Sequence, residues 1–104
     1  MTDRQLIKYL TQFGFTRAQA KVYVAGLELG RALMAPLARR AGVKRTTVYY
    51  FMDELLRRGF FAKRKIGKRN YYVAASPRRM LEMVHERKHL VLKILPALEK
   101  VCYK

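Results

Sequence analysis

Residues 31–59, RALMAPLARRAGVKRTTVYYFMDELLRRG, carry the strongest fold signal in the chain, because they predict two helices joined by a glycine turn. Pro36 suits the first turn of a short helix that reaches about residue 41, since a helix leaves the N–H groups of its first turn unpaired. Gly42 can adopt the left-handed conformation that ends a helix. A longer helix should then run from about residue 45 to residue 58.

Three residues in this stretch have the spacing of a helix-turn-helix: Ala38, Gly42 and Val48. A small residue lets two helices cross closely, glycine makes the turn, and a branched apolar residue fills the crossing. The inward stripe of the longer helix should consist of Val48, Met52 and Leu55. Its outward face should then present Thr46, Tyr50, Asp53 and Arg57, with Thr47 and Tyr49 at the edges.

Two further helices are predicted ahead of this motif. Thr2 can cap the first, and Thr16 can cap the second with Gln19 three residues later, as in a capping box. The second helix should end at Gly30. Gly26 lies inside it and should weaken it by about 1 kcal/mol relative to alanine.

The segment after the motif, residues 60–75 (FFAKRKIGKRNYYVAA), reads as a β-hairpin with Gly67 and Lys68 in the turn. Tyr71 and Tyr72 alternate in direction, so one should enter the core and the other should be exposed. The cations of the hairpin are expected to gather at its tip and to form a wing: Lys63, Arg64, Lys65, Lys68 and Arg69.

Ser76 and Pro77 provide an N-cap and a first-turn proline for a last helix of some 25 residues. One apolar seam of this helix has coiled-coil spacing and is expected to pair two copies of the chain through Leu81, Val84, Val91, Leu95 and Leu98. A second seam should pack against the domain: Met80, Met83, Leu90, Ile94 and Val101. The predicted fold is mainly α with a small β-hairpin, a winged helix-turn-helix over residues 1–75 followed by a long coiled-coil-like dimerisation helix over residues 76–104.

The composition favours a polyanionic partner. The chain has 104 residues, the length of one domain, and 51% of them are apolar, enough for a core. Its 23 Lys and Arg against 7 Asp and Glu give a net charge of +16. Nucleic acid is the commonest partner of such a charge, and a basic membrane-surface helix is less consistent with cations spread over several elements.

The cysteine content and hydropathy indicate a cytoplasmic protein. A single cysteine, Cys102, cannot form an internal disulfide, which favours a reducing compartment. No apolar run approaches the ~20 residues of a membrane span, and the N-terminus lacks the apolar core of a signal peptide. With nucleic acid as the partner, the expected location is the nucleoid.

Residues 85–89, HERKH, match the H-E-x-x-H string of zinc metalloproteases. A catalytic zinc site needs a third protein ligand and an open coordination position, and His85 and His89 are the only histidines of the chain. Both fall at flanking or outer positions of the predicted coiled coil, so ordinary surface histidines are the favoured interpretation, with adventitious metal binding between two chains as the alternative. No residue pattern indicates catalysis, and no cofactor or metal site is predicted.

Cations at two predicted helix starts support nucleic-acid binding over a purely structural helix pair. Lys44 and Arg45 open one helix, and Arg78 and Arg79 open the last one. Cations are mildly unfavourable there because the helix dipole is positive at its N-terminus. Phosphates would remove this cost by accepting hydrogen bonds from both the side chains and the helix ends.

Three stretches of the chain resemble the N-terminal winged-helix domain of TrmB-like transcriptional regulators, many of which respond to sugars: LTQFGFTRAQAKVYVAGLELG, LARRAGVKRTTVYYFMDELLRRGFF and GKRNYYVAASP. The resemblance covers about residues 10–77. It implies that residues 45–58 form the recognition helix, that the hairpin is the wing and that the following helix dimerises. It includes no sugar-binding domain. The chain departs from the family pattern at Gln19, Gly26 and Lys44, where members commonly carry glutamate, leucine and proline.

The sequence thus predicts a homodimeric, sequence-specific regulator of transcription that binds double-stranded DNA. The recognition-helix residues would be Lys44, Arg45, Thr46, Thr47, Tyr49 and Tyr50. The wing cations would contact DNA, and the backbone contacts would come from Arg39, Arg40, Arg78 and Arg79. The alternatives are a nonspecific nucleoid or RNA-binding protein and a module whose long helix binds a different partner. No small-molecule effector is indicated.

Overall fold

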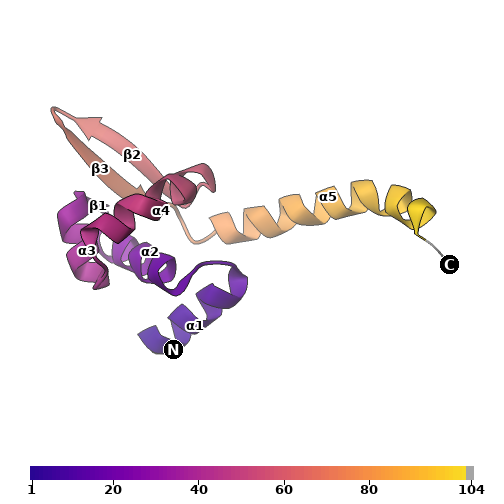
Figure 1. Cartoon of the computed structure of the whole chain (residues 1–104), viewed down its shortest axis with the longest axis horizontal. Helices are drawn as coiled ribbons and strands as arrows, with labels where there is room; N and C mark the ends of the chain where they lie inside the picture. Colours follow the sequence, from indigo (N-terminus) through magenta and orange to yellow (C-terminus); the bar gives the residue numbers. More distant parts are fainter. Residues whose placement is uncertain (103–104) are drawn as a thin grey trace.

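The computed structural model describes residues 1–102 as a winged helix followed by a long helix (Figure 1). In chain order the elements are α1 (Asp3–Phe13), α2 (Arg17–Leu29), β1 (Arg31–Ala32), α3 (Met34–Ala41), α4 (Arg45–Arg57), β2 (Phe61–Ile66), β3 (Arg69–Ala74) and α5 (Arg79–Val101). This mainly helical chain with a small antiparallel sheet confirms the predicted fold class.

The first two helices begin at the predicted caps. The hydroxyl of Thr2 accepts from the backbone N–H of Gln5, and the Gln5 side chain accepts from the Thr2 N–H, which completes a capping box. Thr16 and Gln19 form the second box in the same way. The buried Gln19 also donates from Nε2 to Oε2 of Glu54 over 2.9 Å, so the cap of α2 is tied to α4.

The core gathers around α2, where Tyr23 lies among the rings of Phe15, Phe60 and Phe61. Tyr23 is 1% exposed, and its hydroxyl donates to the carbonyl oxygen of Ala75 over 2.8 Å. Burial raises the pKa of this phenol, because the charged form would lose its hydration. One side chain thus anchors the end of the hairpin to the centre of the helical layer.

Gly26 lies inside α2 and also at a close contact between this helix and the hairpin. A Cβ on Gly26 would lie 2.8 Å from both Cε1 and Cζ of Phe61 and 3.1 Å from the Cβ of Ala74. The expected weakening of the helix therefore accompanies a steric requirement, since only glycine lets α2 approach the hairpin this closely.

The sheet has the order β1-β3-β2, with antiparallel pairing throughout. The hairpin turn is the predicted one, and Gly67 adopts a φ of 64° that favours glycine. The two-residue strand β1, in which Arg31 pairs with Val73 and Ala32 with Tyr72, was absent from the prediction. Two residues are too few to show an alternating pattern, so only the neighbouring β3 reveals this strand.

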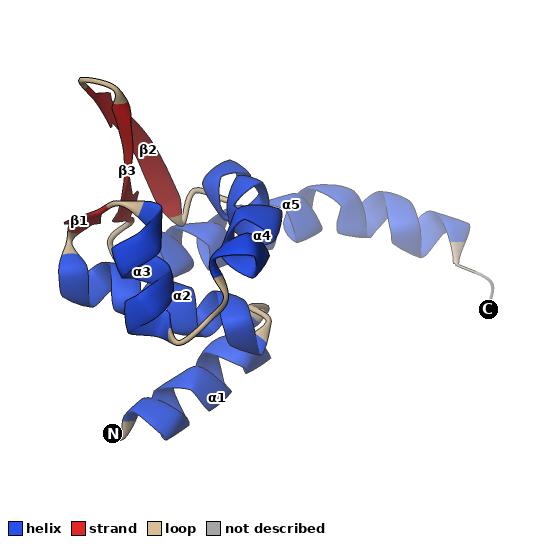
Figure 2. Cartoon of the chain, turned by 60° about the vertical axis from the view of Figure 1, so that its left-hand side comes forward, coloured by secondary structure: helices blue, strands red, loops and turns tan. Residues whose placement is uncertain are grey.

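The last helix differs from the prediction in two respects. It begins at Arg79 rather than beside Ser76, because Pro77 and Arg78 form a turn in which the Ser76 hydroxyl accepts from the Arg78 N–H. Figures 1 and 2 show α5 leaving the rest of the fold, and Met83 is its one buried residue among those described.

The second apolar seam therefore packs against the domain only through Met80 and Met83, and the prediction is wrong for the exposed Leu90, Ile94 and Val101. No helix within residues 1–102 combines the length and the apolar character required to cross a bilayer.

Candidate nucleic-acid interface

The crossing of α3 and α4 has the small, glycine and branched residues at the positions predicted for a helix-turn-helix. Ala38 and Val48 are buried, at 4% and 0% exposed, and Gly42 between the helices is left-handed with φ 69° and ψ 32°. The N–H of Val43 returns to the carbonyl of Ala38 over 3.1 Å. The turn is therefore held by its own backbone, which fixes the angle at which α4 leaves α3.

One face of helix α4 is buried in the core, and the opposite face is exposed to solvent. Its inward residues are buried as predicted: Val48, Met52 and Leu55, together with Phe51. The predicted contact residues Thr46, Thr47, Tyr49 and Tyr50 are all exposed. Tyr50 is the most open at 89%, and Tyr49 is 49% exposed. The hydroxyls on the first turns of α4 are thus free of the protein's own packing.

The N-terminus of α4 has no side-chain cap, since Lys44 occupies the N-cap position without such a hydrogen bond. Backbone N–H groups at an uncapped helix start are ready donors to an anion. The guanidinium of Arg45 lies 5.8 Å from the centre of the Tyr49 ring, a cation–π distance that orders a long side chain. Lys44 and Arg45 thus place two cations beside unpaired N–H groups.

The wing presents its cations on two faces rather than as one cluster. Across the hairpin, Lys63 pairs with Tyr72 and Lys65 with Asn70. Because strand residues two apart share a face, Lys63 and Lys65 lie on the face that Tyr72 buries against the core. Arg64 pairs with Tyr71 and belongs to the opposite face. The expectation of a single basic tip is therefore incomplete.

A cavity of about 330 Å³ joins α4 to the wing. It is lined by the starts of α3 and α4 and by β3: Leu33, Met34, Ala35, Arg45, Tyr49, Arg69, Asn70 and Tyr72. Arg45 and Tyr49 from the predicted recognition helix thus border the same hollow as Arg69 from the predicted wing. The two sets of residues, separate in the sequence, form one concave surface.

Tyr72 forms the floor where this hollow meets the core. It is 7% exposed, and burial raises the pKa of its phenol, with smaller contributions from Tyr49 and Asp53. Tyr71, on the opposite face of β3, is partly exposed as the alternation predicts. The floor therefore stays uncharged near neutral pH while the rim of the hollow is basic.

The two arginines at the end of α3 have different surroundings. Arg39 is exposed. Arg40 donates to the carboxylate of Glu28 in α2, and this hydrogen bond raises the pKa of the guanidinium. The guanidinium of Arg40 is thus already paired with an acidic residue of the same chain.

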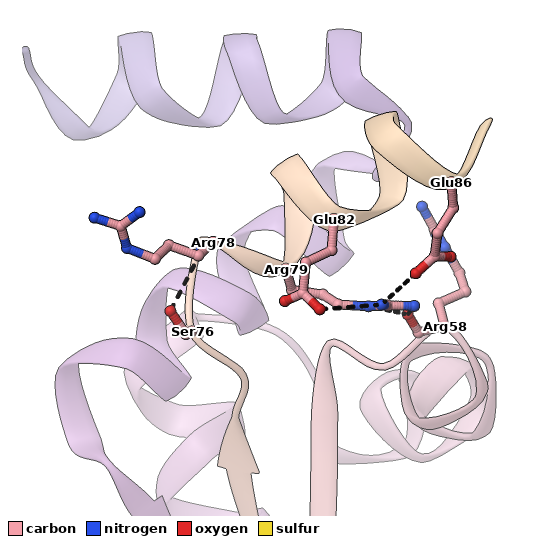
Figure 3. Close-up of polar contacts among 6 residues, drawn as sticks. All are labelled: Arg58, Ser76, Arg78, Arg79, Glu82 and Glu86. Atoms are coloured by element: carbon pink, nitrogen blue, oxygen red, sulfur yellow. Dashed lines mark hydrogen bonds and ion pairs between the residues drawn. The ribbon is translucent and has the colours of Figure 1, made fainter. Parts of the chain in front are cut away.

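The two arginines at the start of α5, Arg78 and Arg79, also have different surroundings (Figure 3). The side chain of Arg78 points away from the polar cluster in which Arg79 lies. Arg79 donates to the carbonyl oxygen of Arg58 from Nε and Nη2, at 3.4 and 3.5 Å, and its Nη1 lies 3.2 Å from the carboxylate of Glu86. A further contact joins Arg79 to Glu82 at 3.9 Å. Arg79 therefore fastens α5 to the end of α4.

Two polar residues at the interface were missed by sequence reasoning. Asn70 lines the hollow between α4 and the wing. Arg31 in β1 places its guanidinium 5.2 Å from the centre of the Tyr71 ring, on the second face of the wing. Predicting β1 would have revealed Arg31, since pairing with β3 brings it to the hairpin.

The predicted dimerisation residues of α5 are exposed, between 42% for Leu95 and 67% for Leu81. His85 and His89 are also exposed, and their rings lie 4.5 Å apart. Within residues 1–102, no group of three or more His, Cys, Asp or Glu side chains is placed to hold a metal ion. Cys102 is exposed.

Comparison with known proteins gives a consistent result. Residues 10–78 match the family model described as "Sugar-specific transcriptional regulator TrmB". The chain is 26% identical over 86 residues to the HTH-type sugar sensing transcriptional regulator TrmBL1 of Pyrococcus furiosus, an alignment that covers 83% of this chain and 25% of that protein. The chain thus spans about a quarter of the length of this relative.

Among solved structures, TrmBL2, described as an archaeal chromatin protein with a novel mode of DNA binding, matches with a TM-score of 0.84 and 26% identity. The match covers 97% of this chain and 39% of the TrmBL2 chain. A weaker likeness, with a TM-score of 0.47 and 13% identity, is to Sso10a-2, a DNA-binding protein from Sulfolobus solfataricus. It covers 81% of this chain and 96% of that one.

Proposed function

Because this chain belongs to the TrmB family, whose model matches residues 10–78, we propose that it binds double-stranded DNA in a sequence-specific manner as a homodimer and regulates transcription. The observation that carries the proposal is the exposed first half of α4 beside a basic wing, with one hollow between them. The buried stripe of α4 holds this surface rigidly, as recognition requires. Such a protein would act at the nucleoid.

Residues at the start of α4 would read the major groove. Arg45 can donate two hydrogen bonds to a guanine edge, and the hydroxyls of Thr46, Thr47 and Tyr50 can bond to base edges or phosphates. Tyr49, which borders the hollow under Arg45, would position that guanidinium. Each good bidentate base contact contributes about 1 to 3 kcal/mol of discrimination.

The remaining cations would hold the DNA backbone. Lys44 and the uncapped start of α4 suit one phosphate, and Lys63, Lys65 and Lys68 suit the phosphates beside the wing. Arg69 pairs with Ile66 and so belongs to the face of Arg64, but it borders the hollow and would contact a phosphate there. Arg64, on the opposite face, would contribute mainly to the long-range field. Arg39 and Arg78 are open to phosphate, whereas Arg40 and Arg79 are omitted from the contact set because acids of the same chain bind them.

Residues 76–104 would form the dimerisation segment and residues 1–75 the DNA-binding domain. Helix α5 has 23 residues and buries only Met83 among those described, so it lacks the packing of an apolar face from which most helices in proteins draw their stability. A second copy of α5 would cover this seam: Leu81, Val84, Val91, Leu95 and Leu98. A two-fold axis along α5 would place the two α4 helices at half-sites about 10 bp apart, or a multiple of that spacing.

The DNA proposal is tested by comparing Arg45→Ala with Lys68→Ala. Duplexes selected from a random pool provide the specific ligand, and random duplex provides the nonspecific one. Arg45→Ala should reduce discrimination between the two by about 1 to 3 kcal/mol. Lys68→Ala should weaken binding to both and reduce the slope of log K against log salt by about one unit.

The exposed Lys93 on the outer side of α5 provides the control, because Lys93→Ala removes the same charge far from the hollow. This variant should leave the discrimination unchanged. If all three substitutions weakened every duplex equally, general charge attraction would explain the binding and the proposed role of α4 would be wrong.

The dimer is tested by sedimentation of the full chain. Leu95→Lys combined with Leu98→Lys places two charges in the proposed seam and should give a monomer, whereas Lys93→Ala should remain a dimer. A wild-type chain that sediments as a monomer at the concentrations used for DNA binding would refute the homodimer.

A second candidate is nonspecific coating of DNA, favoured by the net charge of +16. The structural relative TrmBL2 is itself described as a chromatin protein. Competition among the selected duplex, random duplex and structured RNA at physiological salt separates the candidates. Equal affinity for both duplexes would favour coating, and preference for RNA would exclude both forms of duplex recognition.

A further inference from the structure

The exposed pair His85 and His89 on α5 has no part in the proposed DNA contacts or in the dimer seam. We propose that these two imidazoles form a bidentate site for a divalent transition-metal ion such as Zn²⁺ or Cu²⁺. Residues four apart lie one above the other on a helix, so both rings project from the same side of α5. The site is distinct from the zinc-protease arrangement that the HERKH string suggested, because it supplies two nitrogen ligands and no catalytic machinery.

The geometry of the two rings carries the proposal. Their Nε2 atoms lie 3.1 Å apart, with the ring centres 4.5 Å apart and the planes at 78°. Nitrogens bound at about 2.0 to 2.1 Å to one ion stand 3.1 Å apart when the angle between the two bonds is about 100°. This angle lies between the octahedral and tetrahedral values, so the separation of the two nitrogens suits a single ion, and the rings need to turn so that both lone pairs face it.

The two Nε2 atoms lie within hydrogen-bonding distance of each other, so one ring can donate and the other accept, which keeps the two rings together. For an ion to bind both Nε2 atoms, the donor ring would move its proton from Nε2 to Nδ1, so that both Nε2 atoms offer a lone pair to the ion. Imidazole is a preferred ligand for zinc, copper and nickel, whereas Mg²⁺ and Ca²⁺ prefer oxygen. The expected selectivity is therefore for the borderline transition metals.

The position on α5 leaves the pair open to solvent. The side of the helix that packs on the domain carries Met80 and Met83, and the proposed dimer seam runs through residues 81, 84, 91, 95 and 98. In the spacing of that seam, His85 and His89 lie beside it on the side away from Met80 and Met83. Neither domain packing nor the proposed dimer needs to open before an ion enters.

One carboxylate on the same side of the helix favours a cation. Glu82 lies three residues before His85, and its side chain is 64% exposed. The distance between Glu82 and Arg79 is 3.9 Å, longer than the 3.2 Å between Arg79 and its other acidic partner, Glu86. Glu82 could therefore turn towards the ion or bind one of its waters. Arg87 and Lys88 on the neighbouring faces oppose this effect, so affinity should depend on the two nitrogens more than on net charge.

The test is titration of the untagged full chain with Zn²⁺ and Cu²⁺, in a Cys102→Ser background that removes the only thiol. His85→Gln and His89→Gln should each weaken binding by on the order of tenfold or more, because either change leaves a single nitrogen ligand. The double variant should lose the site. Arg87→Gln, an exposed change between the histidines, should bind at least as tightly as the parent.

Spectroscopy gives a second readout that does not depend on affinity. The copper complex should show hyperfine coupling to two nitrogens, and zinc should shift the Nε2 resonances of both histidines. One ion per chain or one per pair of chains would equally support the site, since both require the same two ligands. Binding that persists in the double variant, or copper with one imidazole nitrogen, would overturn the proposal.

Discussion

Replacing Gly26 with alanine should destabilise the protein, although alanine is the better helix former. Helix propensity alone predicts a gain of about 1 kcal/mol from this change in α2. The structure predicts a larger loss, because the new Cβ would lie 2.8 Å from two ring atoms of Phe61 and 3.1 Å from the Cβ of Ala74. Carbon atoms pack best at about 3.5 to 4.0 Å, so three contacts are too short.

The ring of Phe61 has little room to move away. Phe61 is 3% exposed, its ring meets that of Tyr23 edge-on at 6.2 Å, and its backbone pairs with Ala74 across the hairpin. Overpacking a rigid core costs about 1 to 3 kcal/mol, occasionally more. Because three contacts are too short, the upper part of this range applies, about 2 to 3 kcal/mol. After the gain of about 1 kcal/mol in helix propensity is subtracted, we expect Gly26→Ala to lower the free energy of unfolding by about 1 to 2 kcal/mol.

Urea and thermal denaturation followed by circular dichroism, at fixed protein concentration, would measure this loss. For a domain of this size, it corresponds to a fall in Tm of roughly 5 to 15 °C. Phe61→Leu provides the matched background, since leucine lacks the two ring atoms that the new methyl group would meet. There, Gly26→Ala should be neutral or stabilising by up to about 1 kcal/mol. The steric argument would be refuted if Gly26→Ala in the wild-type background were as stable as the parent.

Two further predictions concern a cap and a buried hydroxyl. Thr16→Ala removes the cap of α2 and should cost about 1 kcal/mol in a urea titration, whereas Thr11→Ala within α1 should cost less than about 0.5 kcal/mol; equal losses would contradict the capping role. Tyr23→Phe leaves the carbonyl of Ala75 without its partner and should cost about 0.5 to 1.5 kcal/mol. Because burial raises the pKa values of Tyr23 and Tyr72, their contribution to stability is complete below the ordinary tyrosine pKa of 10.0 and is lost as pH rises through the higher folded-state values. Stability measured across that range should fall less steeply for Tyr23→Phe than for wild type, and identical slopes would exclude ionisation of Tyr23 as a cause.

The sequence alone determined the helices, the caps of α1 and α2 and the hairpin turn, because each depends on residues close together in the chain. A capping box needs Thr16 and Gln19 three residues apart, and the turn needs Gly67 between two β-prone runs. The buried and exposed faces of α4 followed from helical period for the same reason. These local patterns were sufficient to predict the winged helix and the exposure of the residues proposed to contact DNA.

Tertiary structure decided the features that depend on distant residues. The strand β1 exists because β3 lies beside it, and the steric requirement for Gly26 comes from Phe61, a residue of another element. Arg79, a predicted phosphate contact, has Arg58 and Glu86 as its partners within the chain, and α5 buries far less than its apolar seams suggested. A sequence pattern shows that a side chain needs burial or a partner, but only the three-dimensional arrangement determines which group supplies it.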